Sequence, residues 1–271
     1  LYTDSTYPDT FAEQRIETVG GEAKSIATNG TTVVAGIRSA TSSKVEIYAK
    51  NSSGVWEKNQ ELTSPKASGT TRFGQALALS ENTLIVSQPY DDENLPDTVF
   101  IYQKDANDTW VETQQIEASS AFSNDGFGSA LSVSENVLVL AAGGIAPSGA
   151  VYIFEKNTSN VWVETAELYP SDDLFAGGFG ESVAISGNQI IIGASGYDAT
   201  GAFIYEKQSD NSWQEIQQLS APDGQNYTYA RDVAITENRI VIGDVGYTDV
   251  VYDQGETIVY EKGYNGLWNE V

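Results

Sequence analysis

Carboxylates are the side chains of this sequence that could do chemistry, because its 271 residues include 38 Asp and Glu but no His and no Cys. The usual zinc ligand sets, imidazole acid–base catalysis and Ser-His or Cys-His nucleophile pairs are therefore excluded. Two carboxyl groups at a suitable separation are enough for glycoside hydrolysis. The acids here, however, mostly occupy equivalent surface positions of a repeat and form no distinctive pair. We expect a protein that is not an enzyme and has no catalytic residues.

The densest acidic segment, YDDENLPD, contains Asp91, Asp92 and Asp97. Carboxylate oxygens are the ligands that calcium prefers, so these three residues are the metal candidates of the sequence. The equivalent segments elsewhere in the chain, such as GGIAPSG and GYDATG, lack the cluster. A calcium loop motif is therefore missing, and we expect no cofactor.

Tyrosines beside aspartates recur in the same set of predicted loops. The candidate ligand-binding residues are Tyr90, Asp91, Tyr197, Asp198, Tyr247 and Asp249. An aromatic ring offers a platform for the apolar face of a sugar, and a carboxylate accepts hydrogen bonds from its hydroxyl groups. Asp in such a turn also serves local backbone bonding. A carbohydrate-binding lectin is thus the alternative to a protein-contact function.

Five acceptor motifs for N-glycosylation, Asn-x-Ser/Thr without Pro, are present. They lie at Asn29, Asn51, Asn107, Asn157 and Asn226. Turns are rich in Asn, Ser and Thr for structural reasons, which is the alternative explanation of these motifs. Taken as glycosylation sites, they indicate a secreted or cell-surface glycoprotein.

Five Trp residues reveal an internal repeat. Each lies six residues after a Lys, in the pairs Lys50/Trp56, Lys104/Trp110, Lys156/Trp162, Lys207/Trp213 and Lys262/Trp268. An apolar run ending in an aromatic residue precedes each Lys, as in VFIYQK and VYIFEK. Such β-branched and aromatic runs predict strands. Because the Lys and the Trp recur in every unit, we expect both to serve the fold.

Upstream of each such strand lies a predicted hairpin, such as ALALS followed by TLIVS. One unit therefore has four strands, here named a to d in chain order. The repeated Lys residues lie 51–55 residues apart. Four-stranded units of about this length are typical of the blades of a β-propeller. We predict one all-β propeller domain, residues 1–271, with five antiparallel blades at about 19–62, 63–116, 117–168, 169–219 and 220–271. Part of a seven-bladed propeller or of a longer array is the alternative.

The two ends of the sequence resemble two halves of one strand. The chain ends in WNEV, the first half of strand d, while residues 11–18, FAEQRIET, match the second half. In a closed ring, residues 11–18 would complete the last blade and leave no open edge. Between molecules, the same pairing would join copies head to tail into a fibre.

Three units begin with Phe-Gly, at Phe73, Phe127 and Phe179, and a fourth begins with Tyr229. Together with the aromatic strand and the Trp, these units resemble the FG-GAP repeat, the blade of integrin-α-like propellers, in the branch without calcium loops. The resemblance covers nearly the whole chain and implies a propeller fold. It does not specify an activity, because one fold serves many functions.

The formal net charge of −24 makes this an acidic protein that would repel nucleic acid, and no apolar run is long enough to span a membrane. Turns a–b and c–d lie on one face of a propeller. Four of the five glycosylation motifs therefore mark one face, and the Tyr/Asp loops mark the other. We expect a secreted, cell-surface or extracellular-matrix module for cell adhesion, matrix or surface filaments. Its partners would be extracellular proteins or glycans, and copies of itself head to tail.

Overall fold

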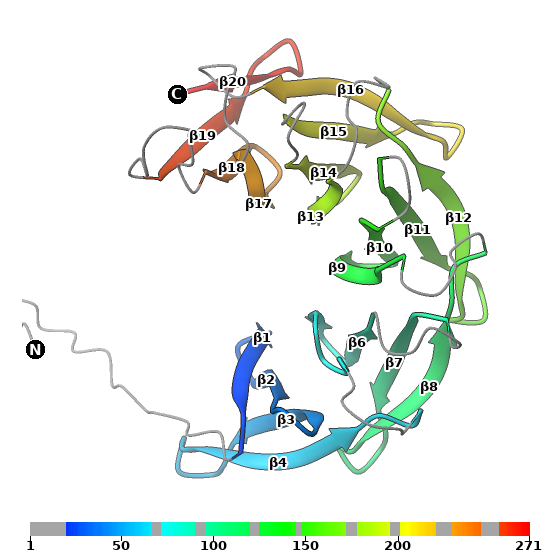
Figure 1. Cartoon of the computed structure of the whole chain (residues 1–271), viewed down its shortest axis with the longest axis vertical. Helices are drawn as coiled ribbons and strands as arrows, with labels where there is room; N and C mark the ends of the chain where they lie inside the picture. The colour runs from blue at the N-terminus through cyan, green and yellow to red at the C-terminus, as the bar shows by residue number, and fades with distance from the viewer. Residues whose placement is uncertain are drawn as a thin grey trace, which may run out of the picture.

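A computed structural model describes residues 20–66, 72–89, 96–119, 125–144, 148–171, 178–195, 201–220, 229–244 and 255–271. Its twenty strands form five four-stranded antiparallel sheets, which we number blades 1 to 5 (Figure 1). This confirms the prediction of an all-β propeller with five blades. Residues 11–18, and with them the proposed completing strand, lie outside the described part.

The strands follow chain order from the centre of the molecule outward. Blade 1 contains β1 (Glu22–Thr28), β2 (Thr32–Arg38), β3 (Ser43–Lys50) and β4 (Trp56–Thr63). Blade 2 contains β5 (Leu77–Ser80), β6 (Thr83–Gln88), β7 (Thr98–Lys104) and β8 (Trp110–Ile116). Blade 3 contains β9 (Phe127–Ser134), β10 (Val137–Ala142), β11 (Ala150–Lys156) and β12 (Trp162–Leu168). Blade 4 contains β13 (Phe179–Ser186), β14 (Gln189–Ala194), β15 (Gly201–Lys207) and β16 (Trp213–Ser220). Blade 5 contains β17 (Tyr229–Ile235), β18 (Arg239–Asp244), β19 (Glu256–Lys262) and β20 (Trp268–Glu270).

The middle strands of the inner blades are mostly apolar, because a neighbouring blade covers each of their faces. All six residues of β14 are buried, for example, whereas the outer strand β8 alternates exposed residues with buried or partly buried ones. The hydrophobic core therefore consists of layers between blades. One layer joins Val139 and Val151 of blade 3 to Ile192 and Phe203 of blade 4.

The Phe-Gly pairs lie where each new blade meets the previous one. The rings of Phe73, Phe127 and Phe179 are at most 1% exposed. Gly74, Gly128 and Gly180 have φ of +80°, +83° and +90°, a conformation that glycine adopts without steric cost. The aromatic ring therefore fills the interface between blades, and the glycine permits close approach of the backbones.

Glutamine side chains connect three of the four neighbouring pairs of blades. Gln60, Gln114 and Gln217 each lie four residues after the Trp of their own blade. Each donates to the carbonyl oxygen and accepts from the N–H of the Trp in the next blade, at 2.7–2.9 Å. At the blade 3–blade 4 contact this position is Ala166, so that interface has no such link.

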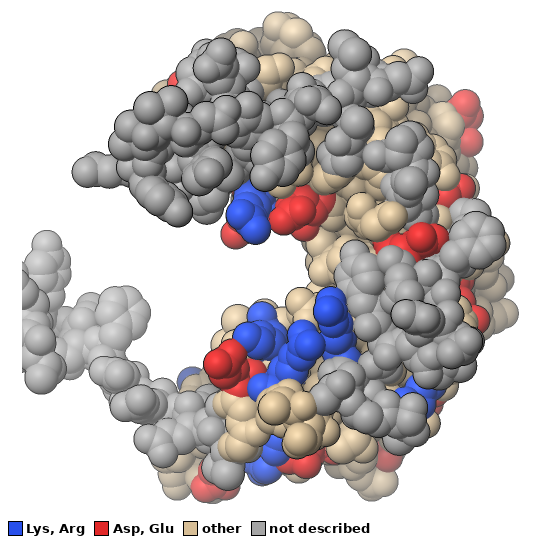
Figure 2. Space-filling model, in the orientation of Figure 1, with Lys and Arg blue, Asp and Glu red and all other residues tan. Residues whose placement is uncertain are grey.

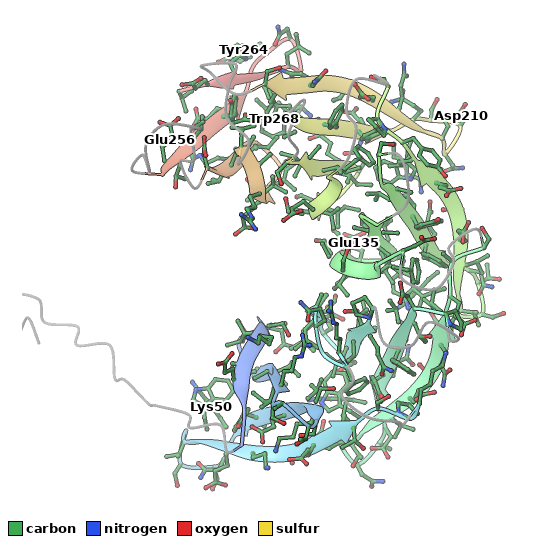
Figure 3. The ribbon with its side chains drawn as sticks, viewed as in Figure 1. Lys50, Glu135, Asp210, Glu256, Tyr264 and Trp268 are labelled. Carbon is green, nitrogen blue, oxygen red and sulfur yellow. The ribbon has the colours of Figure 1, made fainter. Side chains whose placement is uncertain are left out.

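The five blades follow an arc that is open between blade 1 and blade 5 (Figure 1). At the open end, β20 pairs only with Tyr260–Lys262 of β19. In blade 4, by comparison, β16 pairs with the whole of β15. Among the described strands, none pairs with the outer edge of Glu256–Ile258. Figure 3 shows Glu256 and Trp268 in this blade.

Candidate functional site

The c–d turns place glycosylation motifs at the tips of blades 1, 2 and 3. Oδ1 of Asn51 accepts hydrogen bonds from the N–H groups of Ser53 and Val55, at 2.9 and 3.0 Å. Oδ1 of Asn157 makes the same pair of bonds in blade 3. Because these turns use the side-chain oxygen, the amide nitrogen, which is the atom that carries an N-linked sugar, is not needed to hold the turn.

Asn107 lies differently in its turn. In blade 2, Asp105 accepts the N–H groups of Asn107 and Thr109, and these bonds lower the pKa of the Asp105 carboxyl. Asn107 itself is exposed, and its side-chain amide donates a further hydrogen bond to the Asp105 carboxyl. A sugar on Asn107 would therefore leave the two backbone bonds of this turn intact.

The remaining described motif is more constrained. Nδ2 of Asn29 donates to the carbonyl oxygen of Glu81 in blade 2, at 3.1 Å, while its Oδ1 accepts two backbone N–H groups. Nδ2 of Asn51 donates to Oε1 of Glu57 at 2.8 Å. Asn107 and Asn157 are the exposed acceptors of the described c–d turns, and only Asn107 of these two donates to a side chain, the Asp105 carboxyl. Asn226 lies outside the described residues.

The structure places the a–b and c–d turns on one face, as the topology requires. A groove of about 640 Å³ between blades 2 and 3 is lined by residues of both kinds of turn. Glu81, Asn82, Glu135 and Asn136 come from a–b turns, and Asn160 comes from a c–d turn. The motifs at Asn29, Asn51, Asn107 and Asn157 consequently share this face.

The recurring Lys and Trp contact each other within each blade. Every Lys Nζ lies over the indole of its own Trp, with distances to the ring centroid of 4.9–6.0 Å. Trp110, Trp162 and Trp268 are at most 3% exposed. This cation–π contact closes each c–d hairpin, so the pair stabilises the blade.

The predicted ligand loops lie outside the described residues. This applies to Tyr90, Asp91, Asp92, Tyr197, Asp198, Tyr247 and Asp249. Asp97 is described and is 3% exposed. Its Oδ2 accepts the N–H groups of Gly126 and Phe127, at 2.7 and 3.0 Å, and so connects blade 2 to blade 3.

Within the described ranges, no three Asp or Glu residues are grouped so that they could hold a metal ion. No described helix is long and apolar enough to cross a membrane.

Solved structures share the fold at low sequence identity. A Bacteroides uniformis ATCC 8492 protein, described as a candidate 6-phosphogluconolactonase, has a TM-score of 0.67 and 9% identity, over 94% of this chain and 72% of that one. A protein described in the same way from Bacteroides fragilis NCTC 9343 gives 0.64 and 12%, over 94% and 70%. A Lactobacillus plantarum protein gives 0.60 and 11%, over 92% and 70%. At these identities the likeness shows the fold alone.

Sequence comparisons define the family. No curated protein matches the chain. The FG-GAP repeat, in contrast, matches residues 56–102, 110–154 and 162–205, which together make up half of the chain. These segments begin at the Trp of one blade and end in strand c of the next, so they contain the Phe-Gly pairs and interfaces described above. The chain therefore belongs to the FG-GAP repeat family.

Proposed function

We propose that this protein is a non-enzymatic extracellular module that acts by contact, in adhesion, in the matrix or in a surface filament. The observation that carries the proposal is the grouping of four glycosylation motifs on one face, with Asn107 and Asn157 exposed at turn tips. Sugars there would keep this face hydrated. Contacts with partners would then use the opposite face and the two ends of the arc.

The end of the arc at blade 5 supports contact with a second copy. Val241 and Val259 are partly exposed there, whereas Ile191 and Ile204, at the equivalent positions of blade 4, are fully buried under blade 5. The same end carries the outer edge of Glu256–Ile258, with which no described strand pairs. An apolar sheet face next to an open strand edge is a surface that adds another strand or sheet.

The end of the arc at blade 1 exposes an apolar side chain and buries a charged one. Ile26 is 72% exposed, although its equivalent in blade 4, Val183, is 8% exposed. Glu46 lies at the position equivalent to Phe203 of blade 4 and is 2% exposed. It forms an ion pair with Lys44 at 2.8 Å and accepts a hydrogen bond from the Tyr48 hydroxyl at 2.6 Å. Burial raises the pKa of Glu46, but its bonds to Lys44 and Tyr48 outweigh burial, and the pKa is lowered overall.

The two ends also differ in charge. The strands and turns of blade 1 contain five Lys and Arg and four Asp and Glu, a net charge of +1. The described part of blade 5 contains three basic and six acidic residues, a net charge of −3. Opposite charge on complementary surfaces favours association and fixes its direction. We therefore propose head-to-tail contact of blade 5 with blade 1 of the next copy.

A substitution on the open end of β19 tests this contact. Thr257 is exposed on the part of β19 that no described strand pairs with at its outer edge, and Lys on an edge strand opposes pairing with another chain. Thr257→Lys should weaken self-association at least tenfold in sedimentation experiments without lowering the melting temperature. Thr158→Lys is the control, because it makes the same change at an exposed turn far from both ends.

Removing residues 1–18 distinguishes two ways of completing blade 5. If this segment pairs with a second copy, the shortened protein should lose assembly but keep its melting temperature. Loss of thermal stability from a monomer would show instead that the segment completes its own chain. Wild-type protein that stays monomeric, or equal weakening by both Lys variants, would refute the head-to-tail contact.

A further inference from the structure

The residue that follows the Trp of each blade lies on outer strand d, next to the c–d turn. In blade 2 this residue is Val111 and in blade 3 it is Val163, and their side chains are 46% and 44% exposed. Figure 2 shows Asp and Glu atoms at several places along the outer rim of the arc, where strand d of each blade lies. On this acidic rim, the two valines leave apolar surface in contact with water.

The c–d turn of blade 1 shows which atom faces this position. Glu57 is the equivalent residue there, and its Oε1 accepts a hydrogen bond from Nδ2 of Asn51 at 2.8 Å. Oδ1 of Asn51 accepts two backbone N–H groups of the turn, which fixes the orientation of the amide. The amide nitrogen of Asn51 therefore points toward the residue that follows the Trp.

Blade 3 has the same turn with a different neighbour. Oδ1 of Asn157 accepts the same two backbone bonds as Oδ1 of Asn51, so its Nδ2 takes the same direction, toward Val163. Val163 pairs across the hairpin with the residue before the Lys, as Glu57 does. Valine has no acceptor atom and a shorter side chain than glutamate. Within the described ranges, Nδ2 of Asn157 donates no hydrogen bond, and it lies beside an exposed apolar group.

The residue after the Trp varies with the acceptor motif of the turn. Blades 4 and 5, whose c–d turns lack the motif, have Gln214 and Asn269 at this position. Blade 2, whose turn contains the motif at Asn107, has Val111. Blade 1 contains a motif too, but there Glu57 binds the amide nitrogen. An exposed valine thus accompanies the motif in the two blades where this position does not bind the amide.

We propose that the first sugar of an N-linked chain on Asn157 packs over Val163, and that this contact stabilises the c–d hairpin of blade 3. One face of a sugar ring consists of C–H groups, and packing it on the valine removes apolar surface of both from water. The inference rests on the proposed function, because it requires sugar on the face with the glycosylation motifs. It adds that this sugar contributes to the stability of the blade.

Loss of the motif without loss of the turn tests the contact. Ser159→Ala removes the motif but keeps Asn157 and the backbone N–H that donates to its Oδ1. In protein secreted from a eukaryotic host, Ser159→Ala should lower the melting temperature by about 2 °C, because the apolar area of one small contact is exposed. Val163→Thr, which replaces a methyl group by a hydroxyl group, should cause a similar loss. The double variant should lose no more than either single variant, because both changes remove the same contact.

The same variants made in a bacterial host, without sugar, are the control. There both single changes should leave the melting temperature unchanged, since the turn bonds remain and Val163 is exposed. Losses that add up in the double variant, or an equal loss from Val163→Thr without sugar, would overturn the contact alone. Glycopeptide mass spectrometry of the secreted wild type should find sugar on Asn157. Its absence would overturn both the contact and the proposed glycosylated face.

Discussion

Replacing Gly193 by alanine is expected to destabilise the propeller by about 3 kcal/mol, because overpacking a dense interior forces backbone shifts. Gly193 lies in β14, where blade 5 packs on blade 4. A Cβ atom at this position would overlap the backbone carbonyl oxygen of Ala230. A backbone atom cannot swing aside as a side chain does, so blade 5 would have to move. Urea unfolding followed by circular dichroism measures the change.

The matched control is Gly243→Ala in blade 5. Gly243 has the equivalent position, but a Cβ there would meet the carbonyl oxygen of Asp232 at 3.6 Å, an ordinary contact. This variant should change the stability by less than about 0.5 kcal/mol, as substitutions without a clash usually do. Similar losses in the two variants would show that packing of blade 5 on blade 4 is not the cause.

Phe179→Ala should cost about 3–5 kcal/mol, the range for removing a buried aromatic side chain. The Phe179 ring is fully buried and contacts Phe203 edge to face, with centroids 5.4 Å apart. It also packs in the core layer between blades 3 and 4, which lacks the glutamine link of the other interfaces. This interface therefore depends more on apolar packing, and a cavity there should lower the free energy of unfolding strongly. The unfolding midpoint in urea measures the loss.

Tyr264→Ala serves as the control, since it removes an aromatic ring that is fully exposed in the β19–β20 turn (Figure 3). We expect no measurable loss of stability from it. A Phe179→Ala protein as stable as the wild type would contradict the described core.

The repeat made most of the fold predictable. The Lys-to-Trp spacing indicates one hairpin per blade, and the structure shows why it recurs, since each Lys covers its own Trp. The Phe-Gly pairs were equally informative, because few local structures other than a blade start accommodate both a buried ring and a glycine with positive φ. The glutamines four residues after the Trp recur in the sequence too. A polar residue on an outer strand is nevertheless expected to be solvent-exposed, because the sequence alone does not show that a neighbouring blade lies beside it.

The candidate sites were less predictable. The motif at Asn29 resembles the other acceptors in sequence, but the packing of blade 2 beside blade 1 brings its Nδ2 to the carbonyl oxygen of Glu81. Asp97 is a second case: within an acidic segment it suggested a metal ligand, yet its oxygen accepts two backbone N–H groups. Composition alone cannot distinguish those roles.

Glycopeptide mass spectrometry of protein from its native source is the most direct test of whether the face with the glycosylation motifs carries sugar. An extracellular contact module with one sugar-bearing face requires occupied motifs at turn tips. We expect sugar on the peptides that contain Asn107 and Asn157, whose side-chain amides lie at exposed positions. We expect lower occupancy at Asn29, whose Nδ2 donates to the neighbouring blade. Unmodified Asn107 and Asn157 in the native protein would contradict the proposed extracellular role.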